Sequence, residues 1–255
     1  MSSRERHLWD DLETAGRPRG WSVEHALAVL NSGDITAAEL IPWGSNYTFA
    51  VRVECEAEAC LGVYKPLRGE APLWDFPNGL YKREYAAYAL CALLGWGFVP
   101  PTIVRDGPHG LGSLQLYVQP EQADYLSFRE QHVAELQRIC LFDVIANNAD
   151  RKAGHCLKGL DGHIWGIDHG LTFNVQPKLR TVIWDFSGER VPEALEDELL
   201  DFRTDSARIR ELYRCMDGYL YKEELAMLLK RIDAVLAHPV FPATSSRRAY
   251  PWPLY

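Results

Sequence analysis

Apolar and polar residues alternate along three parts of the chain, and such alternation predicts strands that bury one face. The first part contains two strands, at residues 48–53 and 60–64, joined by a turn. Residues 99–120 contain two more strands around a turn rich in Gly and Pro, and Pro120 ends the second of them. A short hairpin is indicated within residues 156–168. The alternation therefore predicts sheet structure mainly in the first half of the chain.

Apolar residues recur every three or four positions in other segments, which is the spacing of a helix that packs one face against a core. A Ser N-cap and a Gly stop bound the first of these helices, at residues 22–34. Residues 80–95 predict a second helix that ends at a Gly, and residues 128–148 predict the longest amphipathic helix. The chain from about residue 193 to 238 is mostly helical in pattern.

The order of these elements predicts an α+β fold with two lobes. Residues 21–119 would form a small, β-rich N-lobe with one main helix, and residues 120–255 a larger and mostly helical C-lobe. Residues 1–20 are polar and rich in Arg, so we expect them to form a flexible N-terminal arm.

The charge of the chain excludes one class of function. The 27 Lys and Arg residues and 35 Asp and Glu residues give a formal net charge of −8, whereas nucleic-acid binders need a dense basic surface. No apolar run approaches the roughly 18 residues of a membrane span, and no polybasic cluster is present, so we expect no docking onto membranes. The absence of a secretory signal and of any C-x-x-C pair among six Cys favours a cytoplasmic protein with reduced thiols.

A lysine lies near the end of the strand in "LGVYKPL", where alternate side chains point into a core. An ammonium on the inner face of a strand is costly unless it is paired, and Glu84 on the next helix can reach back to Lys65. Phosphotransferases use such a Lys–Glu pair between strand and helix to hold nucleotide phosphates. The alternative is an isolated Lys65 that extends its ammonium into solvent.

A turn of small residues precedes the first predicted strand. Ser45 and Asn46 follow Gly44, and Thr48 points to the same face as Asn46. Backbone N–H groups in such a turn can cradle phosphate oxygens. An ordinary turn before a strand has the same composition, so this segment alone leaves both interpretations open.

Two carboxylates follow apolar segments in the second half of the chain, in "NNADRKAGH" and "GIDHGLTF". Asp150 comes after a helix, where an Asx turn is the alternative role. Asp168 ends a hairpin strand, so its carboxylate projects into the adjoining cleft, and His155 lies between the two in sequence. One carboxylate that deprotonates an acceptor hydroxyl, a second that holds a metal ion, and a lysine on the phosphates are what Mg-ATP chemistry requires.

In this order, the motifs resemble those of the atypical kinases that include the phosphatidylinositol 3-/4-kinases and the HipA-type bacterial kinases. Type II phosphatidylinositol 4-kinases are similar in their Lys-Pro pair ("VYKP"), in the Asp-Arg pair after a helix, and in an Ile-Asp-x-Gly-Leu-x-Phe run. An actinobacterial group of uncharacterised proteins resembles the chain more closely still. The resemblance spans about residues 40–190 and implies a bilobal protein-kinase-like fold.

The resemblance also implies roles for individual residues. Lys65 would bind the nucleotide phosphates and Glu84 would orient it, while Asp150 would be the catalytic carboxylate and Asp168 the metal ligand. The strand "LQLYVQP" would be the hinge that receives adenine through its backbone. The hinge residues are Tyr117, Val118 and Gln119.

Two positions depart from the family pattern. The family usually has Asn as a second metal ligand five residues after the catalytic Asp, and His155 stands at that position here. An imidazole in this place can favour Mn²⁺ over Mg²⁺, take another role, or weaken catalysis. His169 likewise replaces the aromatic or small residue often found beside the metal-binding Asp.

These residues lead to the hypothesis of an ATP- and divalent-metal-dependent kinase, using Mg²⁺ or Mn²⁺, that acts on a hydroxyl of a protein or a small molecule. A nucleotide-binding pseudokinase that acts through partners and an enzyme that transfers AMP are the alternatives. A phosphoinositide acceptor ranks lower, because the sequence lacks a basic membrane-facing segment.

Overall fold

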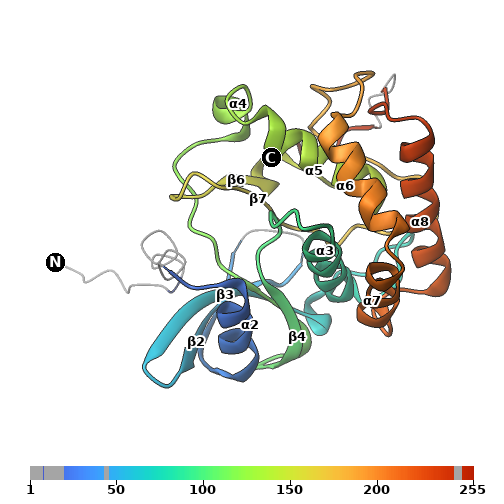
Figure 1. The fold of residues 1–255 in the computed structure, drawn as a ribbon. Helices are drawn as coiled ribbons and strands as arrows, with labels where there is room; N and C mark the ends of the chain where they lie inside the picture. The colour runs from blue at the N-terminus through green and yellow to red at the C-terminus, as the bar shows by residue number, and fades with distance from the viewer. Residues whose placement is uncertain (1–7, 9–19, 43–45, 244–248) are drawn as a thin grey trace.

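A five-stranded antiparallel sheet with the order β1-β2-β3-β5-β4 forms the strand-rich part of the molecule (Figure 1). The computed structural model describes residues 8, 20–42, 46–243 and 249–255, so the predicted arm at 1–20 lies almost wholly outside the described residues. The elements of this sheet and the short turn that follows its third strand are β1 (Asp34–Leu40), β2 (Phe49–Cys55), β3 (Glu58–Pro66), η1 (Leu67–Gly69), β4 (Thr102–Gly107) and β5 (Gly110–Leu116).

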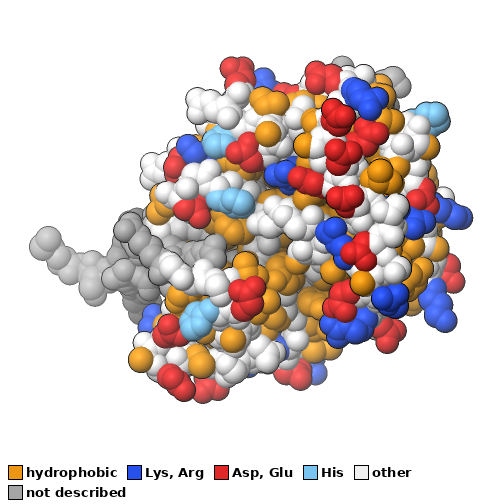
Figure 2. All heavy atoms as spheres, viewed as in Figure 1, with side chains coloured by type: hydrophobic (Ala, Val, Ile, Leu, Met, Phe, Trp, Pro, Cys, Tyr) orange, Lys and Arg blue, Asp and Glu red, His pale blue; other side chains and the backbone are white. Residues whose placement is uncertain are grey.

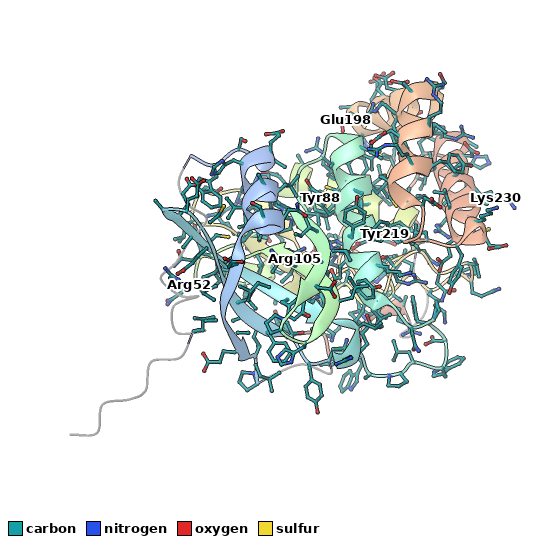
Figure 3. The ribbon with its side chains drawn as sticks, turned by 90° about the horizontal axis from the view of Figure 1, so that it is seen from below. Arg52, Tyr88, Arg105, Glu198, Tyr219 and Lys230 are labelled. Carbon is teal, nitrogen blue, oxygen red and sulfur yellow. The ribbon has the colours of Figure 1, made fainter. Side chains whose placement is uncertain are left out.

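Helix α2 (Val23–Ser32) covers one face of this sheet and closes a small apolar core with it. The Ser22 side chain accepts the N–H of His25 and caps the helix, as the sequence predicts. Arg105 on β4 lies beside the helix (Figure 3) and donates to the carbonyls of Leu30 and Gly33, at 2.8 and 2.7 Å. These bonds fix the end of α2 over the sheet.

Strand β1 is an element that the apolar pattern did not predict. Its residues alternate between exposed and half-buried positions, and none of them is fully buried. Because β1 is an edge strand, its pairing with β2, from Asp34 opposite Glu54 to Leu40 opposite Phe49, decides its conformation. Pairing of this kind leaves only a weak signature in the sequence.

The remaining elements are mostly helical and enclose a second, larger apolar core. The hairpin predicted within residues 156–168 is present, and the helix predicted at 128–148 is divided because turn residues 129–131 separate two helices. The elements are α3 (Leu80–Leu94), α4 (Tyr125–Phe128), α5 (Val133–Ala146), η2 (Ala153–His155), β6 (Cys156–Lys158), β7 (Ile164–Gly166), α6 (Glu193–Thr204), α7 (Ser206–Met216) and α8 (Lys222–Ala237). A strand-rich part followed by a helical part confirms the predicted α+β class.

Helix α3 connects the two parts, although it precedes the predicted lobe boundary in sequence. Its buried side chains, from Ala86 to Leu94, pack in the larger core rather than in the core beneath α2. A buried ion pair joins Arg83 of α3 to Glu224 of α8, and the indole N–H of Trp96, just after α3, donates to Glu198 of α6 at 2.7 Å. The position of α3 is therefore set by the helical part.

The visible surface is acidic over α6, where red side chains gather at the upper right of Figure 2. Helix α6 carries five carboxylates within twelve residues, in the sequence EALEDELLDFRT. Among the described residues, no helix has the length and apolar character needed to cross a membrane.

Candidate active site

Lys65 lies near the end of β3 and points toward α3. Its ammonium is 2.5 Å from Glu84 Oε1 and 2.8 Å from Asp168 Oδ1. The neighbouring strand comes very close here, because a Cβ at Gly112 would lie 2.5 Å from the Lys65 carbonyl oxygen. Burial works to lower the pKa of Lys65, but Asp168 and Glu84 outweigh it and raise that pKa above its ordinary value. Lys65 is therefore a charged, paired lysine, as the sequence predicts.

Glu84 is buried on α3 and uses both of its carboxylate oxygens. One oxygen accepts from Lys65, and the other accepts the backbone N–H of His169 at 2.9 Å. Burial raises the pKa of Glu84, and Lys65 opposes that rise. The same carboxylate therefore ties the sheet lysine to the segment that carries Asp168.

Asp168 follows β7 with a left-handed backbone, at φ +59°. Asp tolerates this region better than most residues, and residues in this region concentrate at functional sites. Its side chain is 46% exposed. Partial burial works to raise the pKa of Asp168, but Lys65 and then His155 hold it well below its ordinary value. Asp168 is thus an ionised carboxylate that solvent can reach.

The loop with Asp150 is held by a buried network that begins on α5. Asp143 accepts two bonds from the fully buried guanidinium of Arg151, at 2.9 Å each, and a third from the Asn148 amide. Arg151 also donates to the Ile167 carbonyl at 2.8 Å and contacts His169 Nε2 at 2.7 Å. One arginine therefore fixes the loop with Asp150 relative to the segment with Asp168.

Asp150 is positioned through its own backbone. Its N–H donates to the Asn148 side chain at 3.0 Å, and its carboxylate lies 3.2 Å from the Lys152 ammonium. Burial raises the pKa of Asp150 and Lys152 opposes it, while Asp168 adds to the rise and Arg180 to the opposition. The Asx turn considered from the sequence belongs to Asn148, which leaves the Asp150 carboxylate available for chemistry.

His155 lies beside Asp168, with Nε2 at 3.3 Å from Oδ2. Its Nδ1 faces the backbone N–H of Lys152 at 3.3 Å, so the neutral ring with its proton on Nε2 would donate to Asp168. Burial lowers the pKa of His155 to about 4, which keeps the ring neutral at pH 7. Two ligands of one Mg²⁺ ion are also about 3 Å apart, so the separation of Asp168 Oδ2 and His155 Nε2 suits one ion. Binding through Nε2 would place the ring proton on Nδ1 and break the bond from the Lys152 N–H.

Asp168 and His155 would supply only part of the coordination of such an ion. Among the described residues, no group of three His, Cys, Asp or Glu side chains is arranged to hold a metal. Mg²⁺ in nucleotide sites usually binds one or two protein ligands, with phosphates and water completing its shell. The residues present fit this kind of site.

The predicted phosphate turn is only partly described. Ser45 lies outside the described residues. The Asn46 side chain accepts the Ala71 N–H at 2.8 Å, and the Thr48 carbonyl accepts the Ile41 N–H at 2.8 Å. These two residues therefore stabilise the loop itself, and their role toward phosphates stays a prediction.

The predicted hinge follows β5 and connects the two parts of the molecule. The Tyr117 N–H donates to the Leu61 carbonyl at 3.0 Å, and the Gln119 carbonyl accepts the Leu160 N–H at 3.3 Å. Val118 between them is buried, at 7% exposure. Adenine would have to use other backbone atoms of this stretch, so its recognition here stays a prediction.

The site also contains three residues that were not predicted from the sequence: Asp143, Arg151 and Lys152. Asp143 had a signal, because a lone charge inside the apolar run "CLFDVIA" must be paired when that helix is buried. The sequence places Arg151 and Lys152 beside Asp150, but their different roles depend on which way each side chain turns.

Two further features lie near the loop that carries Asp150. A groove of about 540 Å³ lies between residues 74–77, residues 174–176 and the start of α8. The Asn147 side chain holds its wall by donating to the Asn174 and Gln176 carbonyls. The described tail at 249–255 reaches the loop after Asp150, where the Leu254 carbonyl accepts the Ala153 N–H at 2.9 Å.

Comparisons with known proteins agree with this arrangement. The family model for phosphatidylinositol 3- and 4-kinase matches residues 110–232, a range that includes Asp150 and Asp168. Protein Rv2133c of Mycobacterium tuberculosis (strain ATCC 25618 / H37Rv) is 36% identical over an alignment of 271 positions, gaps included, that covers 91% of this chain and 95% of that protein. Phosphatidylinositol 4-kinase gamma 4 of Oryza sativa subsp. japonica is 31% identical over an alignment of 155 positions that covers 46% of this chain and 27% of that kinase.

The fold has a parallel among solved structures. The structure of hydra Fam20 with sugar aligns with a TM-score of 0.60 at 15% identity, and covers 91% of this chain and 94% of that chain. This likeness confirms the predicted kinase-like fold, and the relatives confirm the resemblance carried by the three motifs. The chain belongs to the phosphatidylinositol 3- and 4-kinase-like family of atypical kinases.

Proposed function

We propose that the protein is a kinase that uses ATP and a divalent metal ion to phosphorylate a hydroxyl of a protein or a small molecule. The observation that carries this proposal is the Lys65 ammonium, which joins Glu84 of α3 to Asp168 after β7. Family membership adds support, since kinase-like families generally use ATP with a divalent ion. We also propose that the protein is cytoplasmic. We further propose that residues 21–119 form its N-lobe and residues 120–255 its C-lobe.

In the proposed reaction, each residue has a separate task. Lys65, oriented by Glu84, binds phosphate oxygens of ATP and positions them. Asp150 accepts the proton of the acceptor hydroxyl, and its raised pKa makes it a better base than an ordinary carboxylate. Asp168, together with His155, would hold the divalent ion. When bound, such an ion neutralises charge on the phosphates during transfer.

The experiment measures ATP binding by calorimetry and ATP turnover with Mg²⁺ or Mn²⁺. We expect wild-type protein to bind and turn over ATP, and Asp168→Ala to lose metal-dependent binding. Asp150→Asn should keep ATP binding but lose turnover. Absence of nucleotide binding by the wild type would falsify the proposal.

Two outcomes would favour the alternatives instead. Wild-type protein that binds ATP without turnover, with binding unchanged by Asp150→Asn, would indicate a pseudokinase. We consider this alternative because His155 stands where the family usually has Asn. Mass spectrometry of the product separates a phosphate adduct from an AMP adduct.

For the acceptor, we propose the groove between residues 74–77 and 174–176. Trp74 on its rim is 94% exposed, and Glu223 lines the same groove. Exposed aromatic rings beside polar groups suit a ligand with both apolar faces and hydroxyls, and the hydra Fam20 structure is one with sugar. Once an acceptor is found, Trp74→Ala should raise the acceptor KM and leave the ATP KM unchanged. Product formation in phosphoinositide vesicles would overturn our lower ranking of lipid acceptors.

A further inference from the structure

We propose that the Leu8 side chain occupies the place of the adenine base in the ligand-free protein, so that Leu8 and ATP compete for one position. This inference rests on the proposed function and adds a means of regulating it from within the same chain. Neither the apolar pattern nor the family resemblance assigned a role to Leu8.

The sheet has one face toward α2 and one face that carries Lys65. Tyr64 of β3 belongs to the apolar core beneath α2. Because side chains alternate along a strand, Leu61, Val63 and Lys65 lie on the opposite face. Ala50 of β2 lies there too, since it pairs with Val63. An apolar surface therefore continues along β3 from the lysine that would bind phosphates.

Leu8 packs on this apolar surface, beside the predicted hinge. Ala50 is fully buried and Leu61 is 7% exposed. In the described part of the chain, the half-buried side chains packed against these two are Leu8, Ile41 and Tyr117. Tyr117 is the first hinge residue, and its N–H donates to the Leu61 carbonyl at 3.0 Å. Leu8 thus lies where the sheet meets the hinge.

The backbone of Leu8 is held at the same place. Its N–H donates to the Glu39 carboxylate on edge strand β1. A hydrogen bond to an ionised acceptor is roughly twice as strong as one between neutral groups. Both the apolar contact and this bond must break before another group can take the position of Leu8.

The adenine base would need the same position. Pockets for such ligands are lined mainly by apolar side chains, with a few polar groups that fix the orientation. With its edge on the hinge backbone and its phosphates on Lys65, the base would lie against Ala50 and Leu61. Two groups cannot fill one volume, so ATP binds only those molecules that Leu8 has left. The measured Kd is then raised in inverse proportion to that fraction.

The test compares three ligands that contain different parts of ATP. Adenosine has the base without phosphates, and inorganic tripolyphosphate has the phosphates without the base. We expect Leu8→Ser to lower the Kd of ATP and of adenosine by about tenfold each, as when Leu8 blocks about nine-tenths of the molecules. The Kd of tripolyphosphate, measured by the same calorimetry, should stay unchanged.

Two matched variants serve as controls. Leu8→Met keeps an apolar side chain of similar volume and should retain the wild-type Kd values. Leu200→Ser makes the same change as Leu8→Ser at a leucine that is 45% exposed on α6, and it should alter none of the three Kd values.

Glu39→Gln tests the position of Leu8 without changing the apolar surface. It replaces the ionised acceptor of the Leu8 N–H by a neutral one, so the Kd of adenosine should fall by about threefold, less than in Leu8→Ser. An unchanged or higher Kd of adenosine in both variants would contradict the competition.

Hydrogen exchange measures the displacement directly. The Leu8 N–H donates to Glu39 in the ligand-free protein, so a wild-type peptide that contains Leu8 should exchange faster once adenosine is bound. Tripolyphosphate should leave its exchange unchanged. Slower exchange with adenosine would mean that Leu8 forms a wall of the base pocket, and it would overturn the inference.

The possible failures are distinguishable. If neither the wild type nor Leu8→Ser binds ATP or adenosine, the proposed function fails, and the role of Leu8 fails with it. If the wild type binds ATP and Leu8→Ser binds adenosine no more tightly than the wild type does, only the role of Leu8 is overturned.

Discussion

The fully buried guanidinium of Arg151 joins three parts of the site: α5 through Asp143, the end of β7 through the Ile167 carbonyl, and the segment after Asp168 through His169. Arg151→Met leaves Asp143 as a buried and unpaired carboxylate. Breaking such a pair costs about 3–5 kcal/mol, so we expect the free energy of unfolding, measured by urea titration, to fall by that amount.

The matched control for this variant is Arg203→Met. Arg203 also binds an aspartate through two nitrogens, Asp233 at 2.7 and 3.1 Å, but the two side chains are 34% and 51% exposed. An exposed pair contributes about 0–1 kcal/mol. Equal losses in both variants would mean that burial of the Arg151 pair has no special effect on stability.

Asp150 should determine the acid limb of the pH profile for turnover. Its pKa is raised by burial and by Asp168, and opposed by Lys152 and Arg180. Because the base must be ionised, the rate should fall as the pH drops through this raised pKa, at a pH above the ordinary Asp value of about 3.9. Initial rates of turnover between pH 4 and 8 measure this fall. A fall centred at or below the ordinary pKa of Asp would mean that another residue is the base.

The raised pKa of Asp150 also affects the free energy of unfolding, which it lowers as the pH rises. A carboxyl whose pKa is raised on folding binds more protons in the native state between the two pKa values. Its ionisation therefore costs stability as the pH rises through that window, in contrast to the paired and pKa-lowered Asp168. In the proposed function, this cost in stability accompanies a carboxylate that is more basic than an ordinary Asp.

At the scale of the elements, the contact between β3 and β5 sets the position of Lys65. Gly112→Ala would bring a Cβ to 2.5 Å from the Lys65 carbonyl, which the backbone can relieve only by moving one strand. We expect a loss of about 1–3 kcal/mol in unfolding free energy, with weaker ATP binding by calorimetry. Gly154→Ala is the control, because a Cβ there meets nothing within 4 Å.

The C-terminal segment is the second element with a direct effect on the site. The Ala249 carbonyl accepts from the Thr181 N–H and the Trp184 indole, and the Leu254 carbonyl accepts from Ala153 at the start of η2. Deletion of residues 249–255 removes these bonds, each contributing about 0.5–1.5 kcal/mol. We expect lower unfolding free energy and lower turnover, while Trp252→Ala, at a residue 89% exposed, should change neither.

At the scale of the whole molecule there are two separate apolar cores, and α3, which packs in the larger one, also contacts strands β4 and β5 of the sheet. A nucleotide held by Lys65 on one side and Asp168 on the other would link the two cores. Binding at 100 times the Kd stabilises the native state by about 2.7 kcal/mol, so ATP with Mg²⁺ should raise Tm by roughly 5–10 °C. A thermal-shift assay measures this, and an equal rise after addition of a chelator would contradict a metal-dependent site.

Most of the fold could be predicted because the helices and central strands bury long apolar faces with clear periods. Edge strand β1 was missed, since no residue in it is fully buried. The division of the predicted helix at 128–148 was missed as well, because both α4 and α5 contribute buried residues such as Phe128 and Leu136 to one core. Apolar spacing records burial, and it does not record where the chain turns between two buried segments.

The sequence by itself determined the family and the α+β class and indicated Lys65, Glu84, Asp150 and Asp168 as candidate site residues, because spaced motifs and buried charges leave a pattern in one dimension. The sequence indicated the pair between Lys65 and Glu84, and only the tertiary structure decided the other charge pairs. It placed Asp168 between Lys65 and His155, paired Arg151 with Asp143, and put Lys152 on Asp150. Neighbouring residues in "DRK" differ in role because their side chains point in different directions, and electrostatic interaction depends on distance in space rather than on separation along the chain.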